Sequence, residues 1–124
     1  MSQGPQAPLD FSISAPKSVR VGQPAPIVLR ITNVSDKSVE AHFLGRTIAF
    51  DIVVTTSDGT IVWRRLGEGA GQSILQLRTL VPGETMEWRD NWIPKRVGRY
   101  RVQGVLPSDS PEPRRTDWVE IDVR

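Results

Sequence analysis

The sequence contains no cysteine and a single histidine, His42, among its 124 residues. Without cysteine the chain can form no disulfide, no thiolate zinc site and no cysteine nucleophile. With only one histidine, a metal site would have to be formed mainly by carboxylates. The aspartates, however, are scattered rather than spaced like a calcium-binding loop. No serine stands in the strand–turn–helix context of a nucleophile elbow. These absences predict a protein that is not an enzyme and that holds no metal or cofactor.

Long apolar runs are also absent, since no stretch approaches the roughly 18–20 residues that a membrane span needs. The first ten residues, MSQGPQAPLD, lack the basic and apolar regions of a signal peptide. Arginine outnumbers lysine by 13 to three, but acidic residues are interspersed among them and the formal net charge is only +2. A nucleic-acid-binding protein normally carries a clustered basic stripe. We therefore expect a cytoplasmic protein that binds neither nucleic acid nor membrane.

Helical periodicity is missing too, because prolines and β-branched residues interrupt every candidate helix. Apolar residues alternate with period two instead, as in β-strands. The alternating rows are Ile27, Leu29, Ile31; Val39, Ala41, Phe43; Ile48, Phe50, Ile52, Val54; Met86, Trp88, Trp92; Tyr100, Val102, Gly104, Leu106; and Val119, Ile121, Val123. This pattern predicts an all-β fold, an immunoglobulin-like antiparallel β-sandwich of eight to nine strands without a disulfide. We expect it to span residues 9–124 as a single domain, after a flexible N-terminal tail over residues 1–8.

Two turns have specific sequence signatures. Ser57-Asp58-Gly59 predicts a tight hairpin, because the glycine can supply the positive φ that such turns need. Val81-Pro82-Gly83-Glu84 predicts a type II turn, with proline and glycine at its two central positions. Asn33-Val34-Ser35 fits a glycosylation acceptor, which is relevant only in a secretory pathway.

The segment from Trp63 to Leu66 joins a predicted strand to a glycine-rich stretch. Alternation places Trp63 in the core, where it would hold the following loop from below. Arg64 then faces the other side of the sheet, within reach of Asp51 on the preceding strand. The glycines lack the lysine and the following helix of a phosphate-binding loop.

Several short motifs between residues 50 and 106 form one pattern. They are Phe50-Asp51-Ile52, Asp58-Gly59, Val62-Trp63-Arg64, Gly69, Gln72, Leu80, Pro82-Gly83-Glu84, Trp92, and Gly98 to Leu106. This pattern, with VGQPAPIVLRITNVSDKSVEAHF upstream, resembles the intracellular proteinase inhibitor family typified by a Bacillus protein. The resemblance covers about residues 17–106. It implies a β-sandwich and a protein partner, with a serine protease as the candidate, because the founding member inhibits a cytosolic subtilisin-like protease. The chain departs from the family at Arg65-Leu66 and at Ala70-Gly71, where the pattern has Trp-Ser and an aromatic residue.

The position of a binding surface follows from the order of the strands. Successive antiparallel strands place their connections at alternate ends, so segments 15–23, 44–47, 66–72 and 93–98 should share one end. Turns 33–38, 57–59, 81–84 and 107–115 should share the other. Glycine-rich tips edged by arginine suit an adaptable binding surface, although the glycines could equally serve wide connections between the sheets. The partner-binding candidates are Arg46, Arg65, Leu66, Gly67, Glu68, Gly69, Gln72, Lys95 and Arg96.

Two other functions remain open at this point. The chain could be a structural or assembly module of immunoglobulin type without inhibitory activity, because alternation exposes Trp118 near Arg114 and Arg115. It could also bind carbohydrate through tryptophans, although Trp88 and Trp92 face the predicted core. The sequence predicts neither the identity of the partner nor the oligomeric state.

Overall fold

The computed structural model describes residues 8–66, 74–108 and 112–124. It is all-β, as predicted, and no helix occurs in that part of the chain. Two of its eleven strands have only two residues, so nine longer strands match the expected eight to nine. The strands are β1 (Leu9–Ser14), β2 (Ser18–Val19), β3 (Ala25–Asn33), β4 (Val39–Leu44), β5 (Asp51–Thr56), β6 (Ile61–Arg64), β7 (Leu75–Leu80), β8 (Thr85–Trp92), β9 (Gly98–Leu106), β10 (Arg114–Arg115) and β11 (Val119–Val123).

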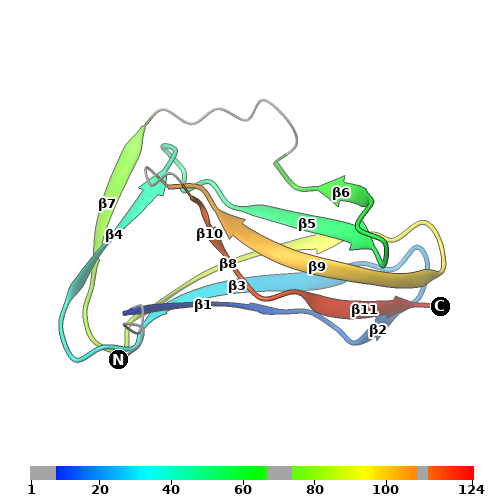
Figure 1. Cartoon of the computed structure of the whole chain (residues 1–124), viewed down its shortest axis with the longest axis horizontal. Helices are drawn as coiled ribbons and strands as arrows, with labels where there is room; N and C mark the ends of the chain where they lie inside the picture. Colours follow the sequence, from blue (N-terminus) through cyan, green and yellow to red (C-terminus); the bar gives the residue numbers. More distant parts are fainter. Residues whose placement is uncertain (1–7, 67–73, 109–111) are drawn as a thin grey trace.

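The strands form two long sheets and one short pair (Figure 1). The first sheet has the order β1-β3-β8, and the second has the order β2-β11-β9-β5-β6 with β10 on β9. All neighbours are antiparallel except β2 and β11. Strands β4 and β7 pair only with each other and stand across one end of the molecule. The tail expected over residues 1–8 lies outside the described residues except for Pro8, whose carbonyl accepts a hydrogen bond from Val34.

The core lies between the two long sheets and contains the alternating rows predicted from the sequence. Ile27, Leu29 and Ile31 of β3 are fully buried and face the row of β9 that includes Gly104. Gly104 has to be glycine, because a β-carbon there would lie 2.4 Å from Cδ2 of Leu29. The two sheets therefore approach each other closely at this point.

Both predicted turns are present. Gly59 has a φ of 92°, and its amide donates to the carbonyl of Thr56 at the tip of the β5–β6 hairpin. Gly83 has a φ of 81°, and the Glu84 amide donates to the Val81 carbonyl, as expected of a type II turn.

Asn33 connects two turns at the end where β4 and β7 lie. Its side-chain amide donates to the carbonyls of Lys37 and Leu80, at 2.7 and 2.8 Å, and its Oδ1 accepts from Ser35. The residue is 0% exposed, so a glycan could not be attached to it in the folded protein. The asparagine of Asn33-Val34-Ser35 is therefore explained by its structural role in joining the two turns.

The predicted distribution of loops between the two ends is wrong in part. It assumed that every strand runs along the sandwich, whereas β4 and β7 run across one end and do not return the chain to the other (Figure 1). Segment 44–50 consequently lies at the same end as turns 33–38 and 81–84. Turn 57–60 lies instead beside segment 93–97, since Thr56 pairs with Tyr100.

Candidate protein-binding surface

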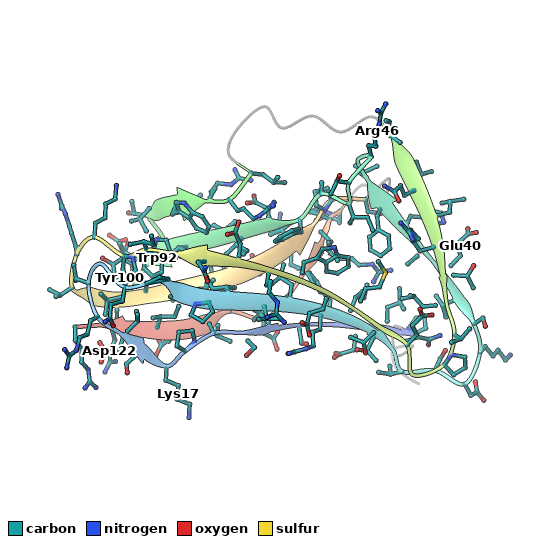
Figure 2. The ribbon with its side chains drawn as sticks, turned by 180° about the vertical axis from the view of Figure 1, so that it is seen from behind. Lys17, Glu40, Arg46, Trp92, Tyr100 and Asp122 are labelled. Atoms are coloured by element: carbon teal, nitrogen blue, oxygen red, sulfur yellow. The ribbon has the colours of Figure 1, made fainter. Side chains whose placement is uncertain are left out.

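The structure describes five of the nine candidate residues, and it does not bring all five together. Arg65 and Leu66 are bonded to Phe50 and Asp51 beside the start of β5, and Arg46 lies at the end where the β4–β7 pair stands. Lys95 and Arg96 precede β9 at the opposite end, beyond Trp92 and Tyr100 (Figure 2). Arg65 and Leu66 lie between these two ends, because Trp63, two residues before Arg65, lines a groove with Lys95 and Arg96. Gly67, Glu68, Gly69 and Gln72 lie outside the described residues.

Asp51 fixes the chain at the end of β6 through hydrogen bonds to Arg64 and Leu66. Its side chain is only 3% exposed, and its Oδ2 accepts hydrogen bonds from Nε and Nη2 of Arg64, at 3.1 and 2.7 Å. Its Oδ1 accepts from the backbone amides of Ile52 and Leu66, at 2.9 and 3.0 Å. Four donors and one positive charge offset the cost of burying this carboxylate. The predicted Arg64–Asp51 pair is confirmed, and the bond to Leu66 adds a function that the sequence did not reveal: it fixes where the chain leaves β6.

Arg65 is held as firmly as Asp51. Its Nε donates to Asp90 on β8 at 2.9 Å, and its Nη1 donates to the carbonyl of Phe50 at 2.9 Å. The guanidinium carbon lies 3.7 Å from the centroid of the Phe50 ring, a cation–π contact. Arg65 thus ties β6 to the edge strand of the other sheet. The expectation that it edges a free tip with few roles in folding is wrong.

The chain is fixed again at Ile74, where its described part resumes. The Gly45 amide donates to the Ile74 carbonyl at 2.7 Å, and the Gln76 side chain donates to the carbonyls of Gly45 and Arg46. The Ala49 amide donates to the Leu44 carbonyl at 2.8 Å, which closes the turn before β5. Segments 44–50 and 74–76 therefore form one hydrogen-bonded unit.

Three apolar side chains are exposed beside this unit. Ile74, Leu75 and Leu77 are 44%, 43% and 52% exposed. Leu75 and Leu77 stand on one face of β7, opposite Leu44 and His42 of β4. Their exposure leaves no signal in the sequence, because Leu-Gln-Leu alternates just as a core strand does. We call the surface formed by Arg46, Ile74, Leu75 and Leu77 the apolar platform.

Trp63 is less deeply buried than expected. It pairs with Val54 and packs against the core, but it is only half-buried and lines a groove with Lys95 and Arg96. The pairing of β5 with β6 shifts between Val54 and Thr55, which leaves Val62 opposite no residue. Asp51 holds the chain where it leaves β6, and the loop that Trp63 is expected to support lies mostly outside the described residues.

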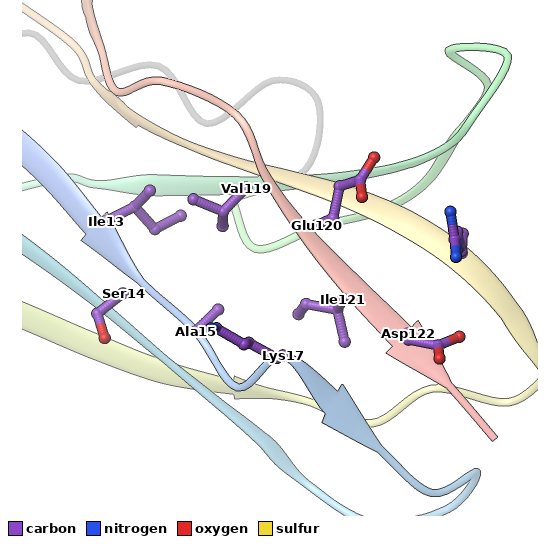
Figure 3. Close-up of a pocket in the computed structure, with 9 residues that line it drawn as sticks. Ile13, Ser14, Ala15, Lys17, Val119, Glu120, Ile121 and Asp122 are labelled. Carbon is purple, nitrogen blue, oxygen red and sulfur yellow. The ribbon is translucent and has the colours of Figure 1, made fainter.

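A larger cleft of about 710 Å³ opens between β1 and β11 (Figure 3). Ile13, Ala15 and Ile121 are among its apolar residues. Its charged residues are of both signs, namely Lys17, Arg99, Glu120 and Asp122. This mixture gives the cleft no preference for a partner of one charge.

Trp118 is 38% exposed, as its alternation predicted. The guanidinium of Arg101 lies 5.0 Å from the centroid of its ring, so its cationic neighbour is on β9 rather than at Arg114 or Arg115. Trp88, by contrast, packs against Phe43 with ring centroids 5.7 Å apart, and Trp92 is buried. These two tryptophans are thus core residues, as expected, and do not form a flat surface for a sugar ring.

Within residues 8–66, 74–108 and 112–124, no three His, Cys, Asp or Glu side chains gather as a metal site would require. The same part of the chain contains no helix long and apolar enough to cross a membrane.

Solved structures with a similar fold include the CARDB domain of a Pyrococcus furiosus protein. Its solution structure superposes with a TM-score of 0.53 at 16% identity, covering 94% of both chains. Its crystal structure, with di-metal ions, gives a TM-score of 0.50 at 17% identity, covering 93% of this chain and 91% of that one. These likenesses concern the fold alone and agree with the predicted immunoglobulin-like β-sandwich.

The alkylpurine DNA glycosylase AlkC of Pseudomonas fluorescens superposes with a TM-score of 0.51 at 13% identity, over 98% of this chain but only 32% of its own. No curated protein sequence matches the chain. Residues 13–111 match the family of intracellular proteinase inhibitors, which agrees with the resemblance seen in the motifs and with a protein that is not an enzyme. Because this match spans most of the chain, the protein belongs to the intracellular proteinase inhibitor family.

Proposed function

We propose that this protein binds and inhibits a serine protease of the subtilisin type in the cytoplasm, with the apolar platform as its contact surface. The observation that carries the proposal is the exposure of Ile74, Leu75 and Leu77 beside two rigidly bonded chain segments. Exposed apolar side chains in one cluster are typical of a protein-binding surface.

Rigidity supports inhibition in particular. A protein inhibitor has to present its contact surface without a large loss of conformational entropy, which favours a preorganised surface. The Leu66 amide is bonded to buried Asp51, and the Ile74 carbonyl is bonded to Gly45. The chain is therefore already fixed on both sides of segment 67–73 in the free protein. Gly67, Glu68, Gly69 and Gln72 stay candidates for the same contact on the basis of the sequence.

The alternative is an assembly module without inhibitory activity. Trp118 favours it, because an exposed tryptophan stacked on an arginine is a frequent interface residue. Sedimentation over a range of concentrations separates the two functions. A chain that self-associates through Trp118 becomes a monomer when Trp118→Ala is introduced, whereas an inhibitor needs no self-association.

The direct test is a titration of residual protease activity against several subtilisin-like enzymes. We expect inhibition by the wild-type chain and at least about tenfold weaker inhibition by the double variant Leu75→Ser and Leu77→Ser. Both side chains are exposed, so the fold should tolerate the change. Val97→Ser is the matched control, since Val97 is 68% exposed at the opposite end. Absence of inhibition at micromolar concentration with every enzyme would remove the proposal.

A further inference from the structure

A second concave surface lies at the end of the molecule opposite the apolar platform. It is a groove of about 290 Å³, just below the usual range of about 300–1,000 Å³ for small-molecule sites. Trp63, Trp92 and Tyr100 line its interior. Its exposed lining residues are Val62, Ile93, Lys95 and Arg96. The groove thus combines an apolar interior with two cations.

The walls of this groove are fixed in the free protein. The rings of Trp92 and Tyr100 pack edge to face, with centroids 5.0 Å apart. The Tyr100 hydroxyl donates to the carbonyl of Arg96 at 2.9 Å, and the Gly22 amide donates to the carbonyl of Pro94 at 2.8 Å. The loop that carries Lys95 and Arg96 is therefore held at both of these points, which lowers the entropic cost of binding.

The charges around the groove are predominantly positive. Lys95 and Arg96 are exposed, and neither forms an ion pair in the described part of the chain. Arg20 and Arg124 lie at the same end, where the Val21 amide donates to the carbonyl of Arg124. The acids of this region have partners of their own. Asp122 pairs with Arg124, Asp90 pairs with Arg65, and Asp58 accepts hydrogen bonds from Thr56 and Thr60 at the hairpin tip.

Strand edges favour an extended ligand. Strand β6 pairs only with β5, and β8 pairs only with β3, so each is an edge strand of its sheet in the described structure. Val62 on β6 and Trp92 at the end of β8 both line the groove. An edge strand offers unpaired backbone amides and carbonyls to a peptide that lies alongside it.

We propose that this groove binds an extended acidic segment of a partner protein, with one large apolar side chain seated in the groove beside Trp63. The carboxylates of the segment would face Lys95 and Arg96. A nucleic acid fits less well, because Trp92 and Tyr100 are buried and packed edge to face and so offer no open ring for base stacking. The inference does not rest on the proposed inhibition, which concerns the other end of the molecule.

Fluorescence anisotropy with a labelled hexapeptide tests this inference on the intact chain. The probe consists of aspartate and glutamate around a single leucine. One control peptide has serine in place of the leucine, and another has lysine in place of the acids. We expect sub-millimolar binding of the probe alone, weakening as salt is added. If the serine peptide bound as tightly as the probe, the proposed apolar contact in the groove would be refuted. If the probe did not bind, the whole proposal would be refuted.

Charge-reversal variants test where on the molecule the probe binds. The double variant Lys95→Glu and Arg96→Glu should bind the probe at least about tenfold more weakly, because it reverses both cations. Lys37→Glu with Arg78→Glu is the matched control, because both residues are exposed at the opposite end, and it should bind like wild type. Unchanged binding by the first pair would refute the site. Binding of anionic lipid vesicles or single-stranded DNA in preference to the probe would likewise refute a peptide ligand.

Discussion

Replacing Gly104 by alanine tests the close contact between the two long sheets at Leu29. The added β-carbon would lie 2.4 and 2.9 Å from the two Cδ atoms of Leu29 and 3.2 Å from its Cγ. Optimal separations between carbon atoms are about 3.5–4.0 Å, so these contacts are strongly repulsive. Leu29 is 0% exposed and cannot move into solvent. Overpacking of a core typically costs about 1–3 kcal/mol, and three simultaneous clashes place Gly104→Ala near about 3 kcal/mol.

Urea denaturation measures this effect. With a typical slope of about 1.5 kcal/mol per molar urea, the midpoint should fall by about 2 M. Gly83→Ala is the control, because its β-carbon would meet nothing within 4 Å and only its φ of 81° is unfavourable. It should cost about 1 kcal/mol. Adding Leu29→Ala to Gly104→Ala should cost less than the sum of the single changes, since the truncation makes room for the new methyl group. A Gly104→Ala midpoint within error of wild type would refute the steric argument.

Three further substitutions have expected costs that can be measured by the same denaturation assay. Asn33→Ala should cost about 2–3 kcal/mol, because it removes bonds to two carbonyls and leaves the buried Leu80 oxygen without its donor; a cost below about 0.5 kcal/mol would contradict this. Asp51→Asn should cost about 1–3 kcal/mol and speed amide exchange at Leu66, since the neutral group holds Arg64 and that amide less well; unchanged exchange at Leu66 would contradict it. Trp63→Ala should cost about 2 kcal/mol, below the ~3–5 kcal/mol of a fully buried aromatic residue, because Trp63 is half-buried; a cost in the higher range would show that it is a core residue after all.

The sequence predicted those features that depend on local pattern. Period-two alternation identified the buried faces of Ile27, Leu29 and Ile31, because side chains alternate across a strand. The glycines at 59 and 83 identified their turns through positive φ. The Arg64–Asp51 pair could be found because both residues belong to one hairpin, whose register follows from its turn.

Features that depend on tertiary arrangement were not predicted. Alternation indicates which face of a strand is buried, but not the direction in which the strand crosses the sandwich, so the transverse course of β4 and β7 was missed. The bond from Arg65 to Asp90 joins two sheets and leaves no local signal in the sequence. Leu75 and Leu77 alternate as core residues do, and they are exposed because none of the described elements covers them.

The central claim is that the apolar platform contacts a subtilisin-like protease, and amide hydrogen exchange tests it most directly. Exchange is compared for the chain alone and for the chain with an excess of catalytically inactivated subtilisin. We predict slower exchange in segments 44–50 and 74–77 and at Leu66, with segment 93–97 unchanged. Slower exchange only at segment 93–97, or no change anywhere, would contradict the claim.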